Sequence, residues 1–330
     1  MISTASALAH PNIAFIKYWG NRDQDLRIPA NGSLSMNLQE LETRTKVSFD
    51  PSLAGDKLIL NGIPEEGAAL QRVSIMLNRI RNMAEFNTFA CVESENNFPT
   101  GAGIASSASA FAALSCAASS AAGLNLPERE LSQLARTGSG SASRSIPEGY
   151  VEWQAGTDHD SSYAFSIAGA DHWNLVDLIA LISKEHKETG SSLGHTVADK
   201  SPIQGARVED ANRRLEICRK ALLEKDFPVF ADIVEQDCNL MHAVMMTSDP
   251  PLYYWLPGTL EVIRAVQIWR RQGLQVCYTI DAGPNVHLIC PVKEAGKVKR
   301  ELGSLSSVKS VLECTPGGPA RLLEPDFPGV

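Results

Sequence analysis

The side chains best suited to chemistry in this chain stand in four short segments spread along its length. The first is D-A-G-P-N at Asp281–Asn285, directly after the apolar run Leu274–Ile280. A carboxylate at the end of a buried strand, followed by a Gly-Pro turn, is a common way to present a catalytic base. The same segment also fits a plain turn that starts with an aspartate.

The second and third segments offer cations and hydroxyls. In A-H-P-N-I-A-F-I-K-Y-W-G-N-R-D, Lys17 and Tyr18 end an apolar run and can hold a phosphate or stabilise negative charge. In G-S-G-S-A-S-R, three hydroxyls precede Arg144, whose paired donors match a carboxylate. The plainer interpretation of the first of these two segments is an edge strand with an aromatic clamp. That of the second is a solvated Ser/Gly loop.

The fourth segment predicts an anion site. Small residues follow Pro99 in P-T-G-A-G-I-A and run into an Ala/Ser-rich stretch predicted to be helical over 104–122. A tight turn that opens a helix leaves backbone N–H groups unpaired, and with the helix dipole they attract anions. A capped helix with a small-residue packing face is the alternative. The residues of this predicted site are Pro99, Gly101, Ala102, Gly103, Ala105, Ser106 and Ser107.

Composition excludes several classes of protein. The 330 residues carry a formal net charge of −8, which argues against nucleic acid as the main partner, because that partner needs a basic face. The seven cysteines are scattered without a C-x-x-C pair, which predicts reduced, buried thiols and no zinc site. No stretch has the length of a membrane span and no leader pattern is visible, so a cytoplasmic protein without a membrane partner is expected.

Apolar periodicity gives the elements that must position these segments. Helices are predicted over 65–85, 104–122, 127–137, 208–223, 227–241, 259–272 and 293–302. Strands are predicted over 46–50, 57–60, 89–93, 164–168, 175–182, 274–280, 286–290 and 308–314, followed by a loose tail. Because strands and helices alternate without regular βαβ spacing, we expect a mixed α+β sandwich in two lobes rather than a doubly wound parallel sheet.

Two polar stretches are expected to lack regular structure. Residues 136–145 are rich in Ser and Gly, which predicts a loop or a low-complexity connector. Residues 184–201 show no apolar period, which predicts a mobile loop that can act as a lid. We place the lobe boundary there, with a first lobe over 1–183 and a second over 184–330.

Together, these segments resemble the mevalonate diphosphate decarboxylase family, within the superfamily of galactokinase, homoserine kinase, mevalonate kinase and phosphomevalonate kinase. The matching pieces occur in the family's order and are N-I-A-F-I-K-Y-W-G-x-R-D, P-T-G-A-G-I-A-S-S-A-S, G-S-G-S-A-S-R-S and Y-T-I-D-A-G-P-N. The resemblance implies a ribosomal S5 domain 2-like N-terminal lobe and an α/β sandwich C-terminal lobe. It also implies an enzyme that uses ATP and Mg²⁺ and that forms a homodimer.

The resemblance implies a role for each matching residue. Asp281 corresponds to the aspartate that orients or deprotonates the 3-hydroxyl of a phosphorylated mevalonate, and Lys17 to a lysine near the reacting phosphate. Arg144 corresponds to the arginine that binds the C1 carboxylate. Ser106 and Ser107 lie in the implied ATP phosphate loop, with Ser107 the implied Mg²⁺ contact. The implied substrate contacts are Tyr18, Trp19, Asn21, Ser139, Ser141, Arg144, Ser191, Ser192 and His195.

Two departures from the family pattern concern the outer phosphate of the substrate. The family's K-Y-W-G-K is K-Y-W-G-N here, so Asn21 replaces a lysine. The S-R-Y-G-M of many bacterial members corresponds to Ser191–His195, which holds no arginine. Since each charge-assisted contact contributes roughly 1.5–3 kcal/mol, two missing cations favour mevalonate 5-phosphate as substrate and isopentenyl phosphate as product.

Three alternatives stay open at this point. The first is action on mevalonate 5-diphosphate, with cations supplied by Lys184, Lys187 or Arg22. The second is a small-molecule kinase of the same superfamily that does not decarboxylate, against which the pairing of Arg144 with Asp281 argues. The third is an ATP-binding regulatory or scaffold protein without catalysis.

Overall fold

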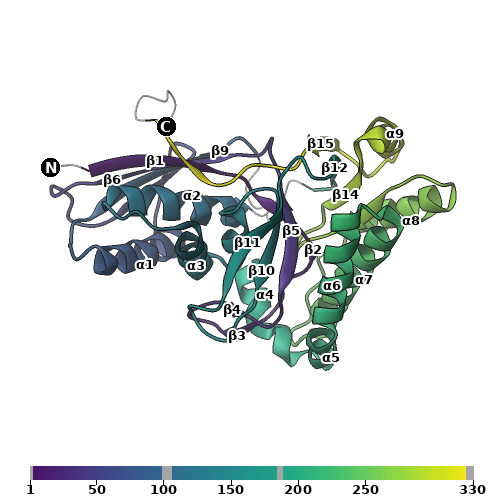
Figure 1. The fold of residues 1–330 in the computed structure, drawn as a ribbon, viewed down its shortest axis with the longest axis horizontal. Helices are drawn as coiled ribbons and strands as arrows, with labels where there is room; N and C mark the ends of the chain where they lie inside the picture. Colours follow the sequence, from purple (N-terminus) through teal and green to yellow (C-terminus); the bar gives the residue numbers. More distant parts are fainter. Residues whose placement is uncertain (1–2, 99–105, 184–188, 325–330) are drawn as a thin grey trace.

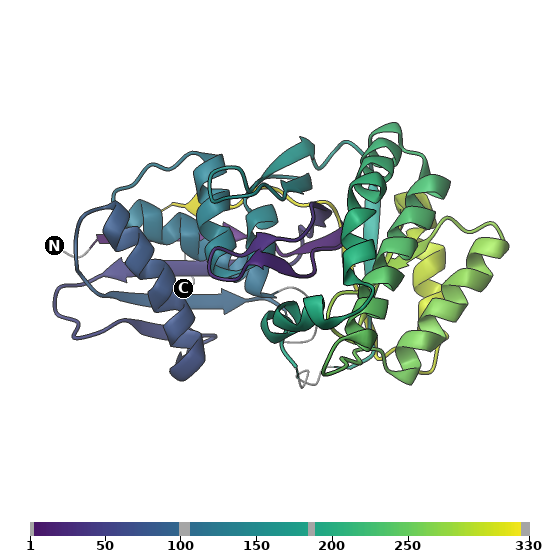
Figure 2. The same cartoon turned by 90° about the horizontal axis from the view of Figure 1, so that it is seen from below.

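The computed structural model describes residues 3–98, 106–183 and 189–324. These residues form two lobes on either side of a central sheet, with the first and last described strands paired in the first lobe (Figure 1). Figure 2 shows the helices of the two lobes at opposite ends of the molecule, with strands between them. None of the helices in the described ranges combines the length and apolar character that a bilayer span requires.

The first lobe is a six-stranded sheet packed against three helices. Buried and half-buried residues alternate along the sheet's central strand, the pattern of a sheet with one face on the core. Neighbouring strands are antiparallel, except that β7 and β9 are parallel. The strand order is β16 (Arg321–Leu323), β1 (Ser3–Ala9), β6 (Thr43–Phe49), β9 (Ala90–Asn96), β7 (Lys57–Leu60), β8 (Ile63–Glu65). The helices are α1 (Gly67–Met83), α2 (Ser106–Ala121) and α3 (Glu128–Gly138).

The central sheet links the lobes. Its core cluster joins apolar residues of β2, β5 and β10 to residues of the second lobe. A two-stranded ribbon follows β2 at the bottom of Figure 1. The sheet's strand order is β11 (Tyr163–Ala168), β10 (Tyr150–Gln154), β5 (Ser33–Asn37), β2 (Asn12–Ile16), and the ribbon is β3 (Asn21–Asp23) with β4 (Ile28–Pro29).

The second lobe packs helices on both faces of a four-stranded sheet. All seven residues of its strand L-V-D-L-I-A-L are buried, because alternate residues face opposite helix layers. The strand order is β13 (Cys277–Thr279), β14 (Val286–Pro291), β12 (Leu175–Leu181), β15 (Ser310–Cys314). One face carries α6 (Ala211–Glu224) and α7 (Phe227–Thr247), and the other α8 (Pro257–Arg271) and α9 (Val292–Gly303).

Strand pairing divides the chain at a different place from the predicted boundary between residues 183 and 184. The strand β12 pairs with β14 and β15, so it belongs to the second lobe. The expected loose tail is also wrong up to Glu324, because β16 returns to the first lobe and pairs with β1. Both segments contribute to sheets whose other strands are distant in sequence.

The two stretches expected to be irregular contain helical structure. The Ser/Gly-rich stretch forms the last turn of α3 and a 3₁₀ helix, η1 (Gly140–Ser145), which is almost fully buried. Beyond residue 190, the loop expected over 184–201 forms α4 (Ser191–Val197) and the short 3₁₀ helix η2 (Ala198–Lys200), and α5 (Gln204–Glu209) follows it. The helix α4 forms because it packs closely on Trp19, where even a Cβ at Gly194 would clash with the Trp19 ring.

Candidate functional site

Lys17 and Asp281 form an ion pair between the lobes. Lys17 directly follows β2, and its Nζ atom lies 2.7 Å from Oδ1 of Asp281, which follows β13. The Lys17 side chain is 1% exposed and that of Asp281 is 27% exposed, so the carboxylate keeps an accessible edge. The structure therefore brings two predicted site residues together across 264 positions of sequence.

Charged partners hold the backbone of Lys17. Asp237 of α7 accepts a hydrogen bond from Lys17 N at 2.6 Å, and Arg207 of α5 donates to Lys17 O at 2.8 Å. Arg214 in turn donates to Asp237 at 2.7 Å, so this buried aspartate is neutralised. Nothing local in the sequence links α5–α7 to the end of β2, so these positioning residues could not be predicted from it.

A buried histidine holds the strand end that carries Asp281. His242 Nε2 donates to Ile280 O at 3.2 Å. Burial lowers the pKa of His242 to about 3, so its ring is neutral at physiological pH and the proton on Nε2 makes this bond. The residue before the carboxylate is thereby fixed in place.

The charge state of Asp281 follows from its neighbours. Burial acts to raise the pKa of this carboxyl, but the charge of Lys17 and interactions with His287 and Arg144 outweigh it. The net pKa of Asp281 is lowered, so the group is an anion at neutral pH.

Arg144 is buried in η1 and held by neutral partners. Its Nε donates to Asn12 Oδ1 at 3.1 Å, and its Nη1 donates to Ser33 Oγ at 2.6 Å. Burial lowers the pKa of Arg144 to about 10, and Asp281 opposes that shift, so the guanidinium stays charged at neutral pH. Among the described residues no carboxylate forms an ion pair with this fixed guanidinium, so its donors are suited to bind a substrate carboxylate.

Tyr18 stands between two other rings. It stacks on His195 with ring centroids 4.1 Å apart and meets Trp153 edge-on at 4.7 Å. His195 Nδ1 accepts a hydrogen bond from Gly20 N at 3.0 Å, which places the histidine proton on Nε2. Trp19 is buried in a core cluster with residues of α4 and α7, so it supports the site from behind.

The Asn21 side chain is engaged with its neighbours. Its Oδ1 accepts a hydrogen bond from the Tyr18 hydroxyl at 2.5 Å, and its Nδ2 donates to Gln24 Oε1 at 2.9 Å. Burial raises the pKa of Tyr18 to about 12, so the phenol is neutral. In this structure Asn21 therefore orients the Tyr18 hydroxyl.

The predicted substrate serines lie beside the start of α2. Ser139 Oγ is 3.2 Å from Ser107 Oγ, which joins the predicted substrate segment to the predicted phosphate loop. Ser141 is half-buried, and its carbonyl accepts a hydrogen bond from Asn12 at 3.1 Å. The glycine before it is needed for close approach, since a Cβ at Gly140 would lie 2.5 Å from the Tyr18 ring.

Part of the predicted phosphate loop lies outside the described residues, namely Pro99, Gly101, Ala102, Gly103 and Ala105. Ser106 and Ser107 are described and begin α2, whose first turn holds no acidic residue that would repel a phosphate. Over the described ranges, no group of three His, Cys, Asp or Glu side chains gathers into a metal site. A magnesium ion bound through nucleotide phosphates needs few protein ligands, and the Ser107 hydroxyl fits that need.

Comparisons with known proteins agree with this site. The diphosphomevalonate decarboxylase-like N-terminal domain matches residues 9–164, and the mevalonate 5-diphosphate decarboxylase C-terminal domain matches 177–318. Diphosphomevalonate decarboxylase from Candida albicans is 39% identical over 299 residues, which cover 86% of this chain and 83% of the relative. The chain belongs to the mevalonate diphosphate decarboxylase family.

Two solved structures of the decarboxylase family are similar to the chain along 98% of its length. MDDEF in complex with MVAPP, AMPPCP and magnesium is 36% identical, with a TM-score of 0.92 and 100% of that chain covered. Mevalonate diphosphate decarboxylase from Staphylococcus aureus is 34% identical, with a TM-score of 0.93 and 99% covered. The predicted family and the predicted two-lobed α+β fold are confirmed.

Two arginines that the sequence patterns did not mark, Arg27 and Arg136, lie near Tyr18 in this family member, and a third, Arg72, lies beside Arg27. Arg27 Nε donates to Thr137 O at 3.1 Å, and Arg72 Nη2 donates to the next carbonyl, Gly138 O, at 3.0 Å. Arg27, Arg144 and Arg136 all act to lower the pKa of Tyr18 against the larger effect of burial. Although Asn21 supplies no charge, the fold brings arginines from the ribbon and α3 near Tyr18, and one from α1 beside Gly138.

Of the other residues considered for the outer phosphate, the structure describes Arg22, Ser191 and Ser192. Arg22 is exposed and donates to the carbonyls of Ala30 and Gly156, while Lys184 and Lys187 lie outside the described residues. Ser191 is half-buried at the start of α4, and Ser192 beside it is exposed.

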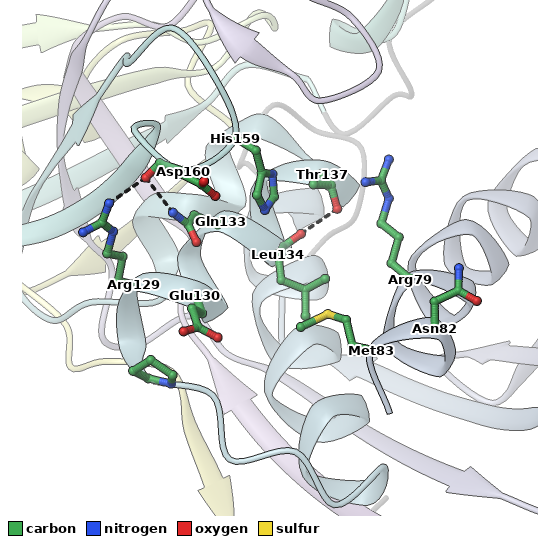
Figure 3. A pocket seen from close by; sticks show the side chains of 11 residues that line it. Arg79, Asn82, Met83, Arg129, Glu130, Gln133, Leu134, Thr137, His159 and Asp160 are labelled. Atoms are coloured by element: carbon green, nitrogen blue, oxygen red, sulfur yellow. Dashed lines mark hydrogen bonds between the residues drawn. The ribbon is translucent and has the colours of Figure 1, made fainter. Parts of the chain in front are cut away.

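A separate pocket of about 650 Å³ lies between α1, α3 and the turn after β10 (Figure 3). Its lining mixes arginines at 79 and 129 with carboxylates at 130 and 160, so its charge is balanced. Arg129 and Gln133 donate to Asp160 O at 2.7 and 2.8 Å. Its lining includes no residue that the sequence analysis placed in the site, and we assign it no part in this chemistry.

Proposed function

We propose that this chain catalyses the ATP-dependent decarboxylation of mevalonate 5-diphosphate to isopentenyl diphosphate. The observation that carries the proposal is the Lys17–Asp281 pair beside a fixed Arg144, in a chain of this family. ATP transfers its terminal phosphate to the 3-hydroxyl, and the phosphate then leaves C3 as the bond to the carboxylate breaks. One turnover consumes one ATP and releases ADP, phosphate and CO₂ with the product.

The charge states of the residues suggest their roles. Arg144 binds the C1 carboxylate and aligns the breaking C–C bond with the breaking C–O bond. Because its pKa is lowered, Asp281 is a weak general base, so orienting the 3-hydroxyl and stabilising positive charge at C3 suit it better. Lys17 offsets negative charge on the transferred phosphate.

ATP and Mg²⁺ are the proposed cofactors. The start of α2, with Ser106 and Ser107, would hold the ATP phosphates, and magnesium would offset their charge during transfer. The structure of MDDEF with AMPPCP and magnesium supports both cofactors.

Mevalonate 5-phosphate is the second candidate substrate, and a specific observation favours it. The neutral Asn21 side chain is already bonded to Tyr18 and Gln24, so it adds no charge for an outer phosphate. The arginines around Tyr18 favour the diphosphate instead. A homodimer and a cytoplasmic location stay predictions.

ADP and CO₂ release should be measured side by side on mevalonate, mevalonate 5-phosphate and mevalonate 5-diphosphate. We expect equal amounts of ADP and CO₂, with the highest kcat/KM on the diphosphate. A higher kcat/KM on the monophosphate would favour the second candidate. ADP release without CO₂ from every substrate would contradict decarboxylation and indicate a kinase.

A further inference from the structure

An excess of positive charge surrounds Tyr18. The charges of Arg27, Arg136 and Arg144 act on it, and Arg72 lies beside Arg27. Over the described ranges no ion pair joins a carboxylate to any of the four guanidinium groups, which are those of Arg27, Arg72, Arg136 and Arg144. Burial lowers the pKa of the last three to about 10, which reflects the cost of keeping a charge out of water. A bound anion would offset that cost.

Arg27 is placed to meet such an anion. It lies in the turn of the β3–β4 ribbon with φ of 51°, and it is half-buried. Its Nε is bonded to Thr137 O, while within the described ranges neither Nη group has a hydrogen-bond partner. A guanidinium held at Nε keeps two donors for a phosphate.

The neighbouring arginines extend this arrangement. Arg72 is bonded to the adjacent carbonyl of Gly138, and its buried Nε has no partner among the described residues. The charges of Arg27 and Arg72 repel each other, which contributes to the lowered pKa of Arg72. Ser139, which is predicted to contact the substrate, directly follows Gly138. Arg27 and Arg72 are therefore bonded to the two residues that precede a predicted substrate contact.

The other two guanidinium groups have separate partners. Arg144 is held by Asn12 and Ser33 on the side of Asp281, where the substrate carboxylate is proposed to bind. Arg136 donates to the His159 ring at 2.9 Å through Nη2, while its Nε and Nη1 are buried without a partner among the described residues. Arg136 and Arg144 are both buried, whereas Arg27 and Arg72 are half-buried, so the latter two are the cations that a second phosphate can reach.

We propose that Arg27, with Arg72 beside it, binds the outer phosphate of the substrate and makes this chain selective for a diphosphate although residue 21 is an asparagine. This inference rests on the proposed function and adds a specificity-determining residue to it. Arg27 lies only six positions after Asn21 in the chain. The β3–β4 ribbon therefore lacks a lysine at position 21 but supplies an arginine at position 27.

The test compares Arg27→Gln and Arg27→Lys with the wild type, using kcat and KM on mevalonate 5-diphosphate and mevalonate 5-phosphate. We expect Arg27→Gln to lower kcat/KM on the diphosphate about ten- to a hundredfold, mainly through KM, because one charge-assisted contact is lost. The monophosphate should change by less than about threefold. Arg27→Lys should restore part of the loss, since it keeps the charge without the paired donors.

Two controls keep the result interpretable. Arg213→Gln removes the same charge from an exposed residue of α6 that pairs with Asp210, and it should leave both substrates unchanged. Thermal melting checks that each variant is folded. Residue 27 has a left-handed backbone conformation, and Gln and Lys carry the same backbone cost there, so a difference between the two variants reflects their side chains.

One result would overturn the inference. It is a ratio of the two kcat/KM values that Arg27→Gln leaves unchanged, whether activity on both substrates falls equally or on neither. Wild-type protein that releases CO₂ from neither substrate would instead refute the proposed function, and the inference with it. The wild-type assay therefore separates failure of the function from failure of the Arg27 assignment.

Discussion

At the scale of single residues, the site depends on Asp281 being held as an anion. Its partner Lys17 is 1% exposed, so the pair is a largely buried charge contact between the lobes rather than a surface ion pair. The same contact lowers the pKa of Asp281 and keeps the buried ammonium neutralised. Any substitution at this position therefore changes both catalysis and stability.

We expect Asp281→Asn to lower turnover by about two to four orders of magnitude, because an amide can neither accept the hydroxyl proton nor stabilise positive charge at C3. The melting temperature should also fall, since Lys17 is left without its counter-charge. Turnover is measured below the melting temperature, with substrate binding followed separately. Asp199→Asn, an exposed aspartate in η2, is the control, and turnover of Asp281→Asn within about tenfold of wild type would exclude the catalytic role.

At the scale of elements, the junction of α3 and η1 needs glycine for close approach rather than for flexibility. Gly140 lies against the Tyr18 ring, and Gly138 lies against Phe111 and Met76. Small residues there let η1 pack between β2, β5 and α2. A Ser/Gly-rich stretch is typical of a loop. Here the small residues are needed because a buried turn of helix packs against neighbouring side chains.

Gly140→Ala should displace Tyr18, because the new Cβ would lie 2.5 Å from its ring. We expect KM for the substrate to rise at least tenfold and stability to fall by roughly 1–3 kcal/mol. KM measurements and thermal melting check this. Gly205→Ala in α5, where a Cβ meets nothing within 4 Å, should leave KM unchanged; equal behaviour of the two variants would refute the steric argument.

A second element-scale prediction concerns Glu235, on α7 against α8 and β13. Burial raises the pKa of Glu235 from 4.5 to about 7, although Arg270 and the Tyr278 N–H oppose the shift. Between these pH values the folded state binds more protons than the unfolded state, so stability falls as pH rises. Relative to Glu235→Gln, unfolding free energy should decrease by up to about 3 kcal/mol from pH 4.5 to 7.

Chemical denaturation at several pH values measures this dependence for both proteins. Glu235→Gln should lose the pH-dependent part of stability that belongs to this residue. Parallel curves for wild type and variant would contradict a raised pKa at Glu235. Glu294→Gln, in the first turn of α9, removes another carboxylate of the second lobe and is the control.

At the scale of the whole molecule, the chain crosses between lobes more than once. After completing the first lobe it contributes β12 to the second, and its end returns as β16 beside β1. Lys17 and Asp281 come from different lobes, so the active site exists only when the lobes are packed together. Loss of β16 should therefore destabilise the first lobe.

Two neighbouring leucines of β16 test this point. Leu323 is 9% exposed and Leu322 is 51% exposed, because successive residues of a strand face opposite sides. Leu323→Ala should cost roughly 2 kcal/mol or more of unfolding free energy, while Leu322→Ala should stay within about 0.5 kcal/mol of wild type. Similar losses in the two variants would indicate that β16 does not pack as described.

Local sequence patterns determined most elements and several of the site residues. The apolar run ending at Lys17 and the one before Asp281 predicted side chains at strand ends, because strand formation and turn chemistry depend on neighbouring residues. The helix propensity of the Ala-rich stretch likewise predicted α2, which begins at the end of the predicted phosphate loop in the sequence.

Only the tertiary structure decided the rest, because it depends on contacts between residues distant in sequence. The helix α4 forms where polar residues dock on Trp19 and Tyr18, and β16 forms because β1 offers it an edge. Arg27 and Arg72 lie 45 positions apart, yet they bond to adjacent carbonyls beside Ser139. Charge at a binding site is summed over space rather than along the chain, so a motif that lacks a lysine does not predict a site that lacks a cation.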